Sequence, residues 1–313
     1  PSQARGQGPG TEAAAAAVQY QTKEGNPSPR MKLDATKLRY LSRDAFRILT
    51  AIEMGMKNHD LVPTELIMTI ARLKRGGVKR AITDCHKLKL IYHEGKKYDG
   101  YRLTYLGYDF LALRALRARG VITGVGNQIG VGKESDIFVC SGPDPKDPEN
   151  ERIYALKLHR LGRVSFRAIK TKRDYMQHRK SASWLYMSRL AAQKEYAFLT
   201  ALHEHGFCVP QPIDCNRHCI VMELVDGFPM VQVGEIVNPK PVYDELMNTV
   251  IRLAQHGLIH CDFNQYNLLI NKNSKTTFID FPQMVCVSFL FFSFSVLFVC
   301  SFVRLFVCSF FFK

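Results

Sequence analysis

Two short segments near residues 260 and 280 carry residues whose types and spacing fit phosphoryl transfer. The first, His260–Asn267, places Asp262 five residues before Asn267. The second, Phe278–Pro282, follows a short apolar hairpin and contains Asp280. Carboxylate and amide oxygens suit Mg²⁺, and transfer of a γ-phosphoryl group depends mainly on positioning and charge neutralisation. We therefore predict that Asp262 orients or deprotonates the acceptor, and that Asn267 and Asp280 hold magnesium.

An upstream strand supplies a cation for the same chemistry. The segment Ile153–Leu158 is largely apolar and contains Lys157. A lysine in such a strand is costly to bury unless it is paired. Its natural partner is Glu195, in the helical stretch Arg189–Leu199, as in the lysine–glutamate pair of kinases. The alternative for Glu195 is an ordinary surface position on a helix.

A glycine turn and a hinge complete the set of parts. Gly130–Asp136 is a glycine-containing turn, and glycines let backbone amides approach phosphate oxygens. Such a turn is by itself more often structural. The run Ile220–Val225 is an apolar strand that enters a turn, as a hinge that presents backbone groups to adenine does. The residues predicted to bind the nucleotide are Gly130, Gly132, Lys133, Ser135, Lys157, Glu195, Met222, Glu223 and Val225.

In this order, the segments resemble the RIO atypical protein kinases, and specifically the second RIO subfamily. The resemblance rests on Gly130–Asp136, Ala155–Arg163, His260–Asn264 and Ile279–Gln283. The turn lacks the third glycine of ordinary kinases, and Pro282 stands where they carry the glycine of Asp-Phe-Gly. Both departures agree with the RIO pattern. The resemblance covers roughly residues 31 to 285.

The resemblance implies an α+β fold, with an N-terminal winged helix followed by a protein-kinase-like bilobal domain whose C-lobe is incomplete. It implies ATP and Mg²⁺ as cofactors, and a serine/threonine kinase or ATPase that acts in maturation of the small (40S) ribosomal subunit precursor. Asp280 itself is then a candidate to take the phosphoryl group. The alternative is a catalytically inactive form that only binds pre-ribosomal RNA or protein through its winged helix.

The N-terminal part reads as three helices, two short strands and a further helix. Ser42 can cap the first helix, and Pro63 opens the second, which we expect Gly76–Gly77 to end. The strands Leu90–His93 and Tyr101–Leu103 bracket a hairpin tip. This order predicts a winged helix. The apolar faces of its three helices are marked by Phe46, Leu49 and Ile52, by Leu66, Ile67, Ile70 and Leu73, and by Ile82, Cys85 and Leu88.

Basic side chains cluster on the third helix and the wing. Phosphate contacts dominate affinity for nucleic acids, and the formal net charge of +15 favours an anionic partner. A solvated basic face is the alternative. Because no set of base-reading residues is recognisable, we favour the rRNA or ribosomal proteins of the pre-40S particle over sequence-specific DNA. The basic residues are Lys74, Arg75, Lys79, Arg80, Lys87, Lys89, Lys96 and Lys97, and a second concentration runs from Arg160 to Lys180.

The predicted domains are a disordered extension (1–30), a winged helix (31–120), a RIO kinase domain (121–285) and an apolar, low-complexity tail (286–313). The N-lobe would end near residue 225. The tail is long enough to span a bilayer, or it could form buried strands. Its residue types all have thymine-rich codons, so we favour a translated non-coding segment and expect no membrane attachment.

An incomplete C-lobe has a physical consequence. The helix Val242–Ala254 offers Leu246, Val250 and Leu253 on one face, and no further helices follow to cover it. Leaving such side chains in water forfeits about 1.5–3 kcal/mol each. We therefore expect the second half of the chain to fold poorly.

The nine cysteines are irregularly spaced and do not suggest a disulfide framework. Cys208, Cys215, His218 and Cys219 lie close together but lack paired Cys-x-x-Cys knuckles, so we expect no zinc site there. Reduced cysteines indicate the cytoplasm, with the nucleus as a second location.

Overall fold

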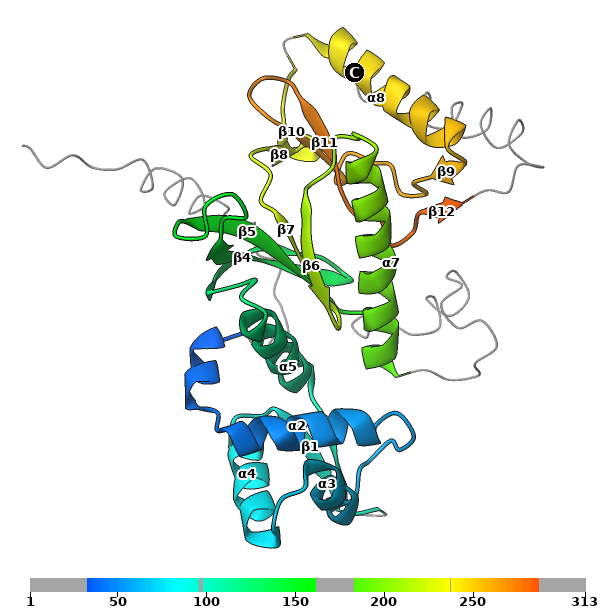
Figure 1. Ribbon diagram of the computed structural model, residues 1–313. Helices are drawn as coiled ribbons and strands as arrows, with labels where there is room; N and C mark the ends of the chain where they lie inside the picture. Colours follow the sequence, from blue (N-terminus) through cyan, green and yellow to red (C-terminus); the bar gives the residue numbers. More distant parts are fainter. Residues whose placement is uncertain (1–32, 96–97, 162–182, 237, 287–313) are drawn as a thin grey trace, which may run out of the picture. The chain divides into compact units, whose positions relative to one another are not determined.

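The computed structural model describes residues 33–95, 98–161, 183–236 and 238–286. The described residues form two compact units (Figure 1). One unit comprises the residues up to Phe110 together with Gly126–Val131, and the other comprises Leu111–Val125 and the residues from Gly132 onward.

The N-terminal unit has the predicted order of three helices, a strand pair and a further helix. Its elements are η2 (Ala35–Tyr40), α2 (Arg43–Gly55), α3 (Thr64–Ala71), α4 (Arg75–Lys87), β1 (Ile91–Glu94), β2 (Gly100–Leu103) and the first turns of α5 (Tyr105–Ala118). As predicted, Ser42 caps α2, and its hydroxyl accepts the amide of Ala45 at 3.1 Å. The hairpin pairs β1 and β2 antiparallel. The core of this unit contains five fully buried residues: Ile48, Leu49, Ile52, Ile67 and Leu90.

The predicted end of the second helix is wrong. Helix α3 ends at Ala71, and Arg72 takes a left-handed conformation with φ 50°. The Arg72 carbonyl accepts a hydrogen bond from Arg47 Nη2 at 3.1 Å, which helps to hold this turn without a glycine. Gly76–Gly77 instead lies in the first turn of α4, where helix amides lack intrahelical partners in any case.

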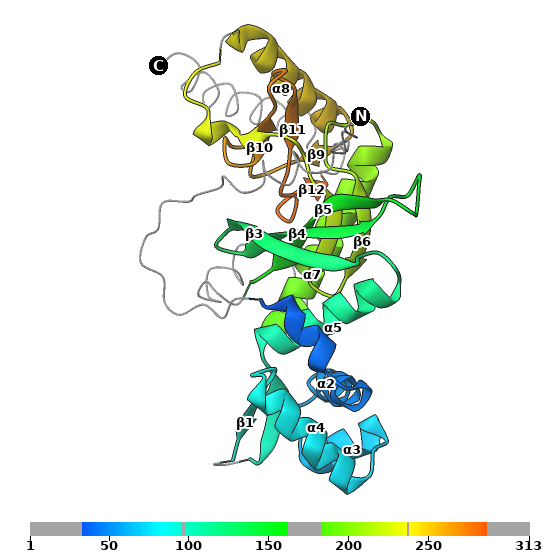
Figure 2. The same cartoon turned by 90° about the vertical axis from the view of Figure 1, so that its left-hand side faces the viewer.

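The second unit contains most of a sheet that carries the lysine strand. Its strands are β4 (Ser135–Pro143), β5 (Glu151–His159), β6 (Pro212–Asn216), β7 (Cys219–Glu223) and the first two residues of β3 (Gly124–Val131), and the pairs β4–β5, β5–β7 and β6–β7 are antiparallel. Lys157 is central, because it pairs with Ile137 of β4 on one side and with Ile220 of β7 on the other. Helix α7 (Trp184–Glu204) packs across one face of this sheet (Figures 1 and 2).

The remaining elements hold the two aspartate segments. They are β8 (Phe228–Pro229), η3 (Met230–Gln232), α8 (Pro239–Gln255), β9 (Leu258–Ile259), β10 (Leu268–Ile270), β11 (Thr276–Phe278) and β12 (Val285–Cys286). β10 lies between β11 and β8, and β12 pairs with β9. One hydrophobic core joins these elements to the sheet and α7, and it includes Ile220, Leu199, Leu246, Phe278 and Phe281.

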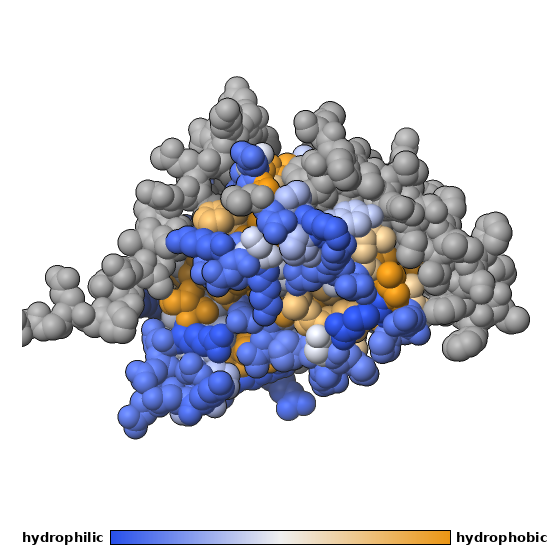
Figure 3. Space-filling view, turned by 90° about the horizontal axis from the view of Figure 1, so that it is seen from above, coloured by the Kyte–Doolittle hydropathy of each residue, from blue (hydrophilic) through white to orange (hydrophobic). Residues whose placement is uncertain are grey.

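The expectation that α8 leaves its apolar face in water is wrong. Leu246, Val250 and Leu253 are only 1%, 4% and 3% exposed, since α8 packs against β9 and β11. Ile251, on the neighbouring face, is 40% exposed. The view from above shows a mainly hydrophilic surface with separate hydrophobic patches (Figure 3).

Several predictions fall outside the described residues. They concern the N-terminal extension, Lys96 and Lys97, the basic run from residue 163 to residue 180, and the tail beyond Cys286. Within the ranges that are described, no helix has both the length and the apolar character needed to cross a bilayer.

Candidate active site

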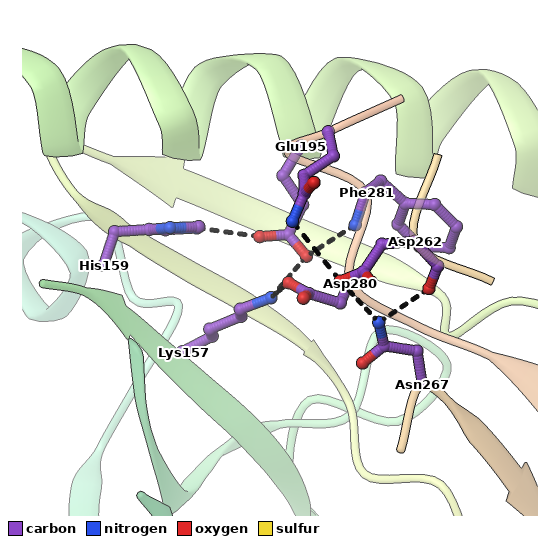
Figure 4. A network of polar contacts seen from close by, with 8 residues as sticks. Lys157, His159, Glu195, Asp262, Asn267, Asp280 and Phe281 are labelled. Carbon is purple, nitrogen blue, oxygen red and sulfur yellow. Dashed lines mark hydrogen bonds and ion pairs between the residues drawn. The ribbon is translucent and has the colours of Figure 1, made fainter. Parts of the chain in front are cut away.

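Lys157 lies at the centre of a charged network made by three elements. From β5, its Nζ contacts Glu195 Oε1 of α7 at 2.6 Å and Asp280 Oδ1 at 2.7 Å (Figure 4). The Lys157 and Glu195 side chains are 5% and 2% exposed, whereas Asp280 is 33% exposed. The lysine therefore links a buried carboxylate to one that solvent or a ligand can reach.

The pKa values of the pair favour the charged forms. Burial by itself would lower the pKa of Lys157, but Asp280 and Glu195 offset this and raise it. Burial would likewise raise the pKa of Glu195, but the nearby Lys157 ammonium group and His159 lower it. Both groups are therefore ionised at neutral pH, as a cation that meets phosphate must be.

His159, which was not predicted from the sequence, also contacts Glu195. Its Nε2 lies 2.7 Å from Glu195 Oε2, and both side chains are 2% exposed. The signal was present in the alternation of β5: residues two apart point to the same face of a strand, so His159 faces α7 together with Lys157.

Asp262 is surrounded by side-chain amides. Its Oδ1 accepts from Asn264 Nδ2 at 2.7 Å, and its Oδ2 accepts from Asn267 Nδ2 at 3.0 Å and from Gln283 Nε2 at 3.3 Å. Neither Asn264 nor Gln283 was predicted to be part of the site. Cys261, the residue before Asp262, has φ 62°, a left-handed conformation that favours glycine.

The two aspartate segments are tied to each other through their backbones. The Ile279 amide donates to the Asn267 carbonyl at 3.0 Å, and Asp280 follows with φ 73°. The Asn267 side-chain amide group faces Asp262, and its oxygen points away from Asp262 (Figure 4). The two predicted magnesium ligands thus come from neighbouring loops.

His260 supports this region from the core. It is 4% exposed, and its ring lies among those of Phe263, Phe278 and Phe281, with centroids 5.3–6.4 Å away. Burial lowers the pKa of His260, so the ring stays neutral at neutral pH. The His260 ring therefore packs in the core beneath the two loops.

The glycine turn is shorter than predicted. Gly130 lies within β3, and the turn consists of Gly132, Lys133 and Glu134, because β4 begins at Ser135. The Gly132 amide donates to the Ser135 carbonyl at 2.7 Å. Ser135 pairs with His159 in the β4–β5 register, so the turn lies beside the strand that carries Lys157. Gly132 and Lys133 are exposed and Ser135 is half-buried.

The predicted hinge residues lie at the end of β7. Met222 is 8% exposed, and Val225 is half-buried. The Glu223 amide donates to the Gln211 carbonyl at 2.8 Å. The Glu223 carboxylate lies 3.3 Å from Arg152 Nη2, so this side chain is held by an ion pair within the fold.

This donor set fits a magnesium nucleotide. Mg²⁺ is usually held by one or two carboxylates together with substrate phosphates; Asp280 offers a carboxylate and Asn267 an amide oxygen. Among the residues that the structure describes, no group of three or more His, Cys, Asp or Glu side chains is placed to hold a metal by itself. The roles assigned to the individual site residues stay predictions.

Comparison with known proteins agrees with this geometry. The family model described as "RIO domain" matches residues 136–289, and the model described as "Rio2, N-terminal" matches residues 38–119. A serine/threonine-protein kinase rio2 of Dictyostelium discoideum is 60% identical over 260 residues, covering 83% of this chain and 49% of the relative. One from Schizosaccharomyces pombe is 49% identical, covering 82% of this chain and 74% of the relative.

A solved structure is similar over most of the chain. It is the Rio2 kinase-ADP/Mg²⁺-phosphoaspartate complex from Chaetomium thermophilum, with a TM-score of 0.74 and 45% identity, covering 90% of this chain and 83% of that one. This chain spans about half the length of some of the curated relatives it matches, such as those of Dictyostelium discoideum and Caenorhabditis elegans.

Proposed function

Because this chain belongs to the Rio2 family of RIO-domain kinases, we propose that it is an ATP- and Mg²⁺-dependent serine/threonine kinase or ATPase. The observation that carries the proposal is the position of Lys157 Nζ, 2.6 Å from Glu195 and 2.7 Å from Asp280. A buried cation next to a half-exposed carboxylate is the pairing that a metal-bound triphosphate needs. The expected α+β architecture, a winged helix and a kinase-like domain, agrees with the family.

Each residue then has a distinct role. Lys157 would hold phosphate oxygens, and Glu195 would orient Lys157. Asn267 and Asp280 would hold magnesium, which neutralises charge on the phosphates when it is bound. Asp262 would orient the acceptor hydroxyl, and its three amide donors fix the direction of its carboxylate.

The similar structure from Chaetomium thermophilum suggests where the phosphoryl group goes. That Rio2 complex contains a phosphoaspartate, and in this chain Asp280 is the candidate acceptor. An Asp280 oxygen would attack the γ-phosphorus while the bond to the departing ADP oxygen breaks. Water would later hydrolyse the acyl phosphate, so that the cycle is an ATPase cycle without a protein substrate.

The test is ATP turnover by the wild-type chain and by Asp262→Ala and Asp280→Ala. We expect each variant to lose at least about 100-fold in turnover, since each removes a group at the reacting centre. Asp244→Ala, on the exposed side of α8, is the matched control and should turn over ATP like the wild type. Unchanged turnover in both site variants would remove the site.

We propose further that the chain acts on the pre-40S ribosomal particle, in the cytoplasm and also in the nucleus. Support comes from the exposed basic residues of the N-terminal unit: Lys74, Arg75, Lys79, Arg80, Lys87 and Lys89. Their affinity for RNA should fall with rising salt. Lys79→Glu with Arg80→Glu should weaken binding to precursor rRNA at least about tenfold, whereas Lys240→Glu on α8 should not.

The alternative is a binding module that catalyses no reaction. The effect of ATP on RNA binding distinguishes it from the enzyme. It would bind precursor rRNA equally well with and without ATP, and it would not bind Mg-ATP.

A further inference from the structure

We propose that His159 is a positioning residue: together with Lys157 it holds both oxygens of the Glu195 carboxylate and keeps α7 in the arrangement that nucleotide binding needs. The inference rests on the proposed function, because it assigns a role within the same site. It differs from that proposal in making a conformational claim that can be measured without nucleotide.

The geometry gives each carboxylate oxygen its own partner. Lys157 Nζ lies 2.6 Å from Oε1, and His159 Nε2 lies 2.7 Å from Oε2 (Figure 4). Lys157 and His159 are alternate residues of β5 and therefore point to the same face of the strand. A carboxylate held at both oxygens from one strand cannot rotate about its terminal bond without losing a contact.

Burial makes the second contact matter. Glu195 and His159 are both 2% exposed, so water cannot replace a lost partner. A buried carboxylate oxygen without a partner is strongly disfavoured. Among the described residues, neither His159 Nε2 nor Glu195 Oε2 has a hydrogen bond elsewhere, and their own 2.7 Å contact is not aligned as a hydrogen bond, so each buried atom has the other as its nearest polar neighbour.

A separate contact holds α7 to the end of β5 at another height. The Leu161 amide donates to Ser188 Oγ at 3.3 Å, and both residues are buried. Ser188 precedes Glu195 by seven residues, about two helical turns, and so lies on the same side of α7. The helix is therefore held at two levels by β5 and the residues that follow it, and His159 belongs to the level of Glu195.

The Glu195 carboxylate also reaches the loop that carries Asp280. Its Oε1 accepts the Phe281 amide at 3.4 Å, next to Asp280. Movement of Glu195 would thus disturb both Lys157 and the loop that carries Asp280. This is the route by which His159 would influence ATP affinity through Glu195, and not by direct contact with the nucleotide.

Three substitutions separate positioning from packing. His159→Phe keeps a ring of similar size but has no donor, whereas His159→Gln keeps a donor at about the reach of Nε2. His159→Asn has the same amide on a shorter side chain and is the matched control for Gln. If His159 only fills space, Phe should be the best replacement; if it positions Glu195, Gln should be.

The first readout is hydrogen exchange of α7 amides in the nucleotide-free protein. We expect exchange around Glu195 to be about tenfold faster in His159→Phe and His159→Asn, and within about threefold of wild type in His159→Gln. His218→Phe, a substitution of another fully buried histidine of the same unit, should not give this local effect. If His159→Phe does not fold, the order of Gln and Asn still decides the matter.

The second readout is the dissociation constant for Mg-ATP. It should rise about tenfold in His159→Phe, with a smaller change in kcat, and His159→Gln should restore it. On a Glu195→Ala background, His159→Phe should have no further effect, because the two residues act as one unit.

Equal exchange and affinity for Phe and wild type, or an additive effect with Glu195→Ala, would overturn the proposal. If the wild-type chain does not bind Mg-ATP, the proposed function fails, while the exchange experiment still tests whether His159 holds α7.

Discussion

The two aspartates of the site are held in opposite ways. Asp262 lies in a half-buried loop and accepts hydrogen bonds from neutral amides, two of them from residues only two and five positions away. Asp280 is paired with a cation, Lys157, that lies 123 residues earlier in the chain. One environment is local and neutral, and the other is long-range and charged.

The two aspartates therefore depend on different parts of the fold for their orientation. Two of the three amide donors, Asn264 and Asn267, belong to the same turn as Asp262 and can orient it before the rest of the unit has folded. The direction of Asp280 depends on β5, α7 and the loop that carries Asp280 being assembled together. We therefore expect substitutions around Lys157 to affect stability and activity together, and those around Asp262 to affect mainly activity.

The largest effect is expected for Lys157→Met. It leaves the buried Glu195 carboxylate without its main counter-charge, and breaking one half of a buried ion pair costs about 3–5 kcal/mol. Urea unfolding would measure this. Arg119→Ala, which breaks a more exposed pair with Asp214, is the control and should cost no more than about 1 kcal/mol. A loss for Lys157→Met that is no larger than the control would break the comparison.

A smaller effect, on activity, is expected from the two asparagines near Asp262. Asn267→Ala removes a predicted metal ligand and a contact to Asp262, so turnover should fall about 100-fold and the Mg²⁺ requirement should rise. Asn264→Ala removes two hydrogen bonds to Asp262 and one from the Tyr266 amide, but no predicted metal ligand. Turnover should therefore fall less than in Asn267→Ala, and the Mg²⁺ midpoint should stay that of the wild type. Titration of turnover with Mg²⁺ measures both. If Asn264→Ala shifts the Mg²⁺ midpoint as strongly as Asn267→Ala, the assignment of Asn267 as the ligand is wrong.

The next prediction concerns acid. The pKa of Glu195 is lowered in the folded chain, so its contribution to stability is present above its unfolded value of about 4.3 and is lost as the pH falls toward the folded value. Each pH unit in that window should cost about 1.4 kcal/mol. Urea midpoints at pH 5, 4 and 3 would measure this. Glu195→Gln should show a shallower slope, and equal slopes would contradict the prediction.

The smallest effect is expected at Cys261. Its φ of 62° disfavours any residue with a Cβ, so Cys261→Gly should raise the free energy of unfolding by about 0.5–1 kcal/mol. Thermal unfolding would detect this. Cys261→Ala removes the thiol but keeps the Cβ, and should bring no gain. A gain with alanine instead would point to the sulfur rather than the backbone.

The outcome for individual elements shows where sequence patterns suffice. The Ser42 cap and the hairpin of β1 and β2 followed from residue types at short spacing, and the structure has them. The end of α3 was predicted wrongly, because an arginine took the left-handed position that a glycine would ordinarily occupy. The burial of Leu246, Val250 and Leu253 was missed because it depends on β9 and β11 packing beneath α8.

The site shows the same division. Lys157 and Glu195 were paired from the order of strand and helix, and they meet at 2.6 Å. His159 was missed because an apolar strand with one lysine seemed complete without it. The amides of Asn264 and Gln283 were missed because nothing in their spacing marks them as donors to Asp262.

The sequence by itself determined the family, the order of the parts, and the loop in which Asp262 and Asn267 lie close together. These depend on residue types a few positions apart, which a turn brings into contact whatever the rest of the chain does. Only the tertiary structure decided which groups share the Glu195 carboxylate and how Asp280 meets Lys157. Those contacts join a strand, a helix and a loop far apart in the chain, and their charges become strongly coupled only where packing excludes water.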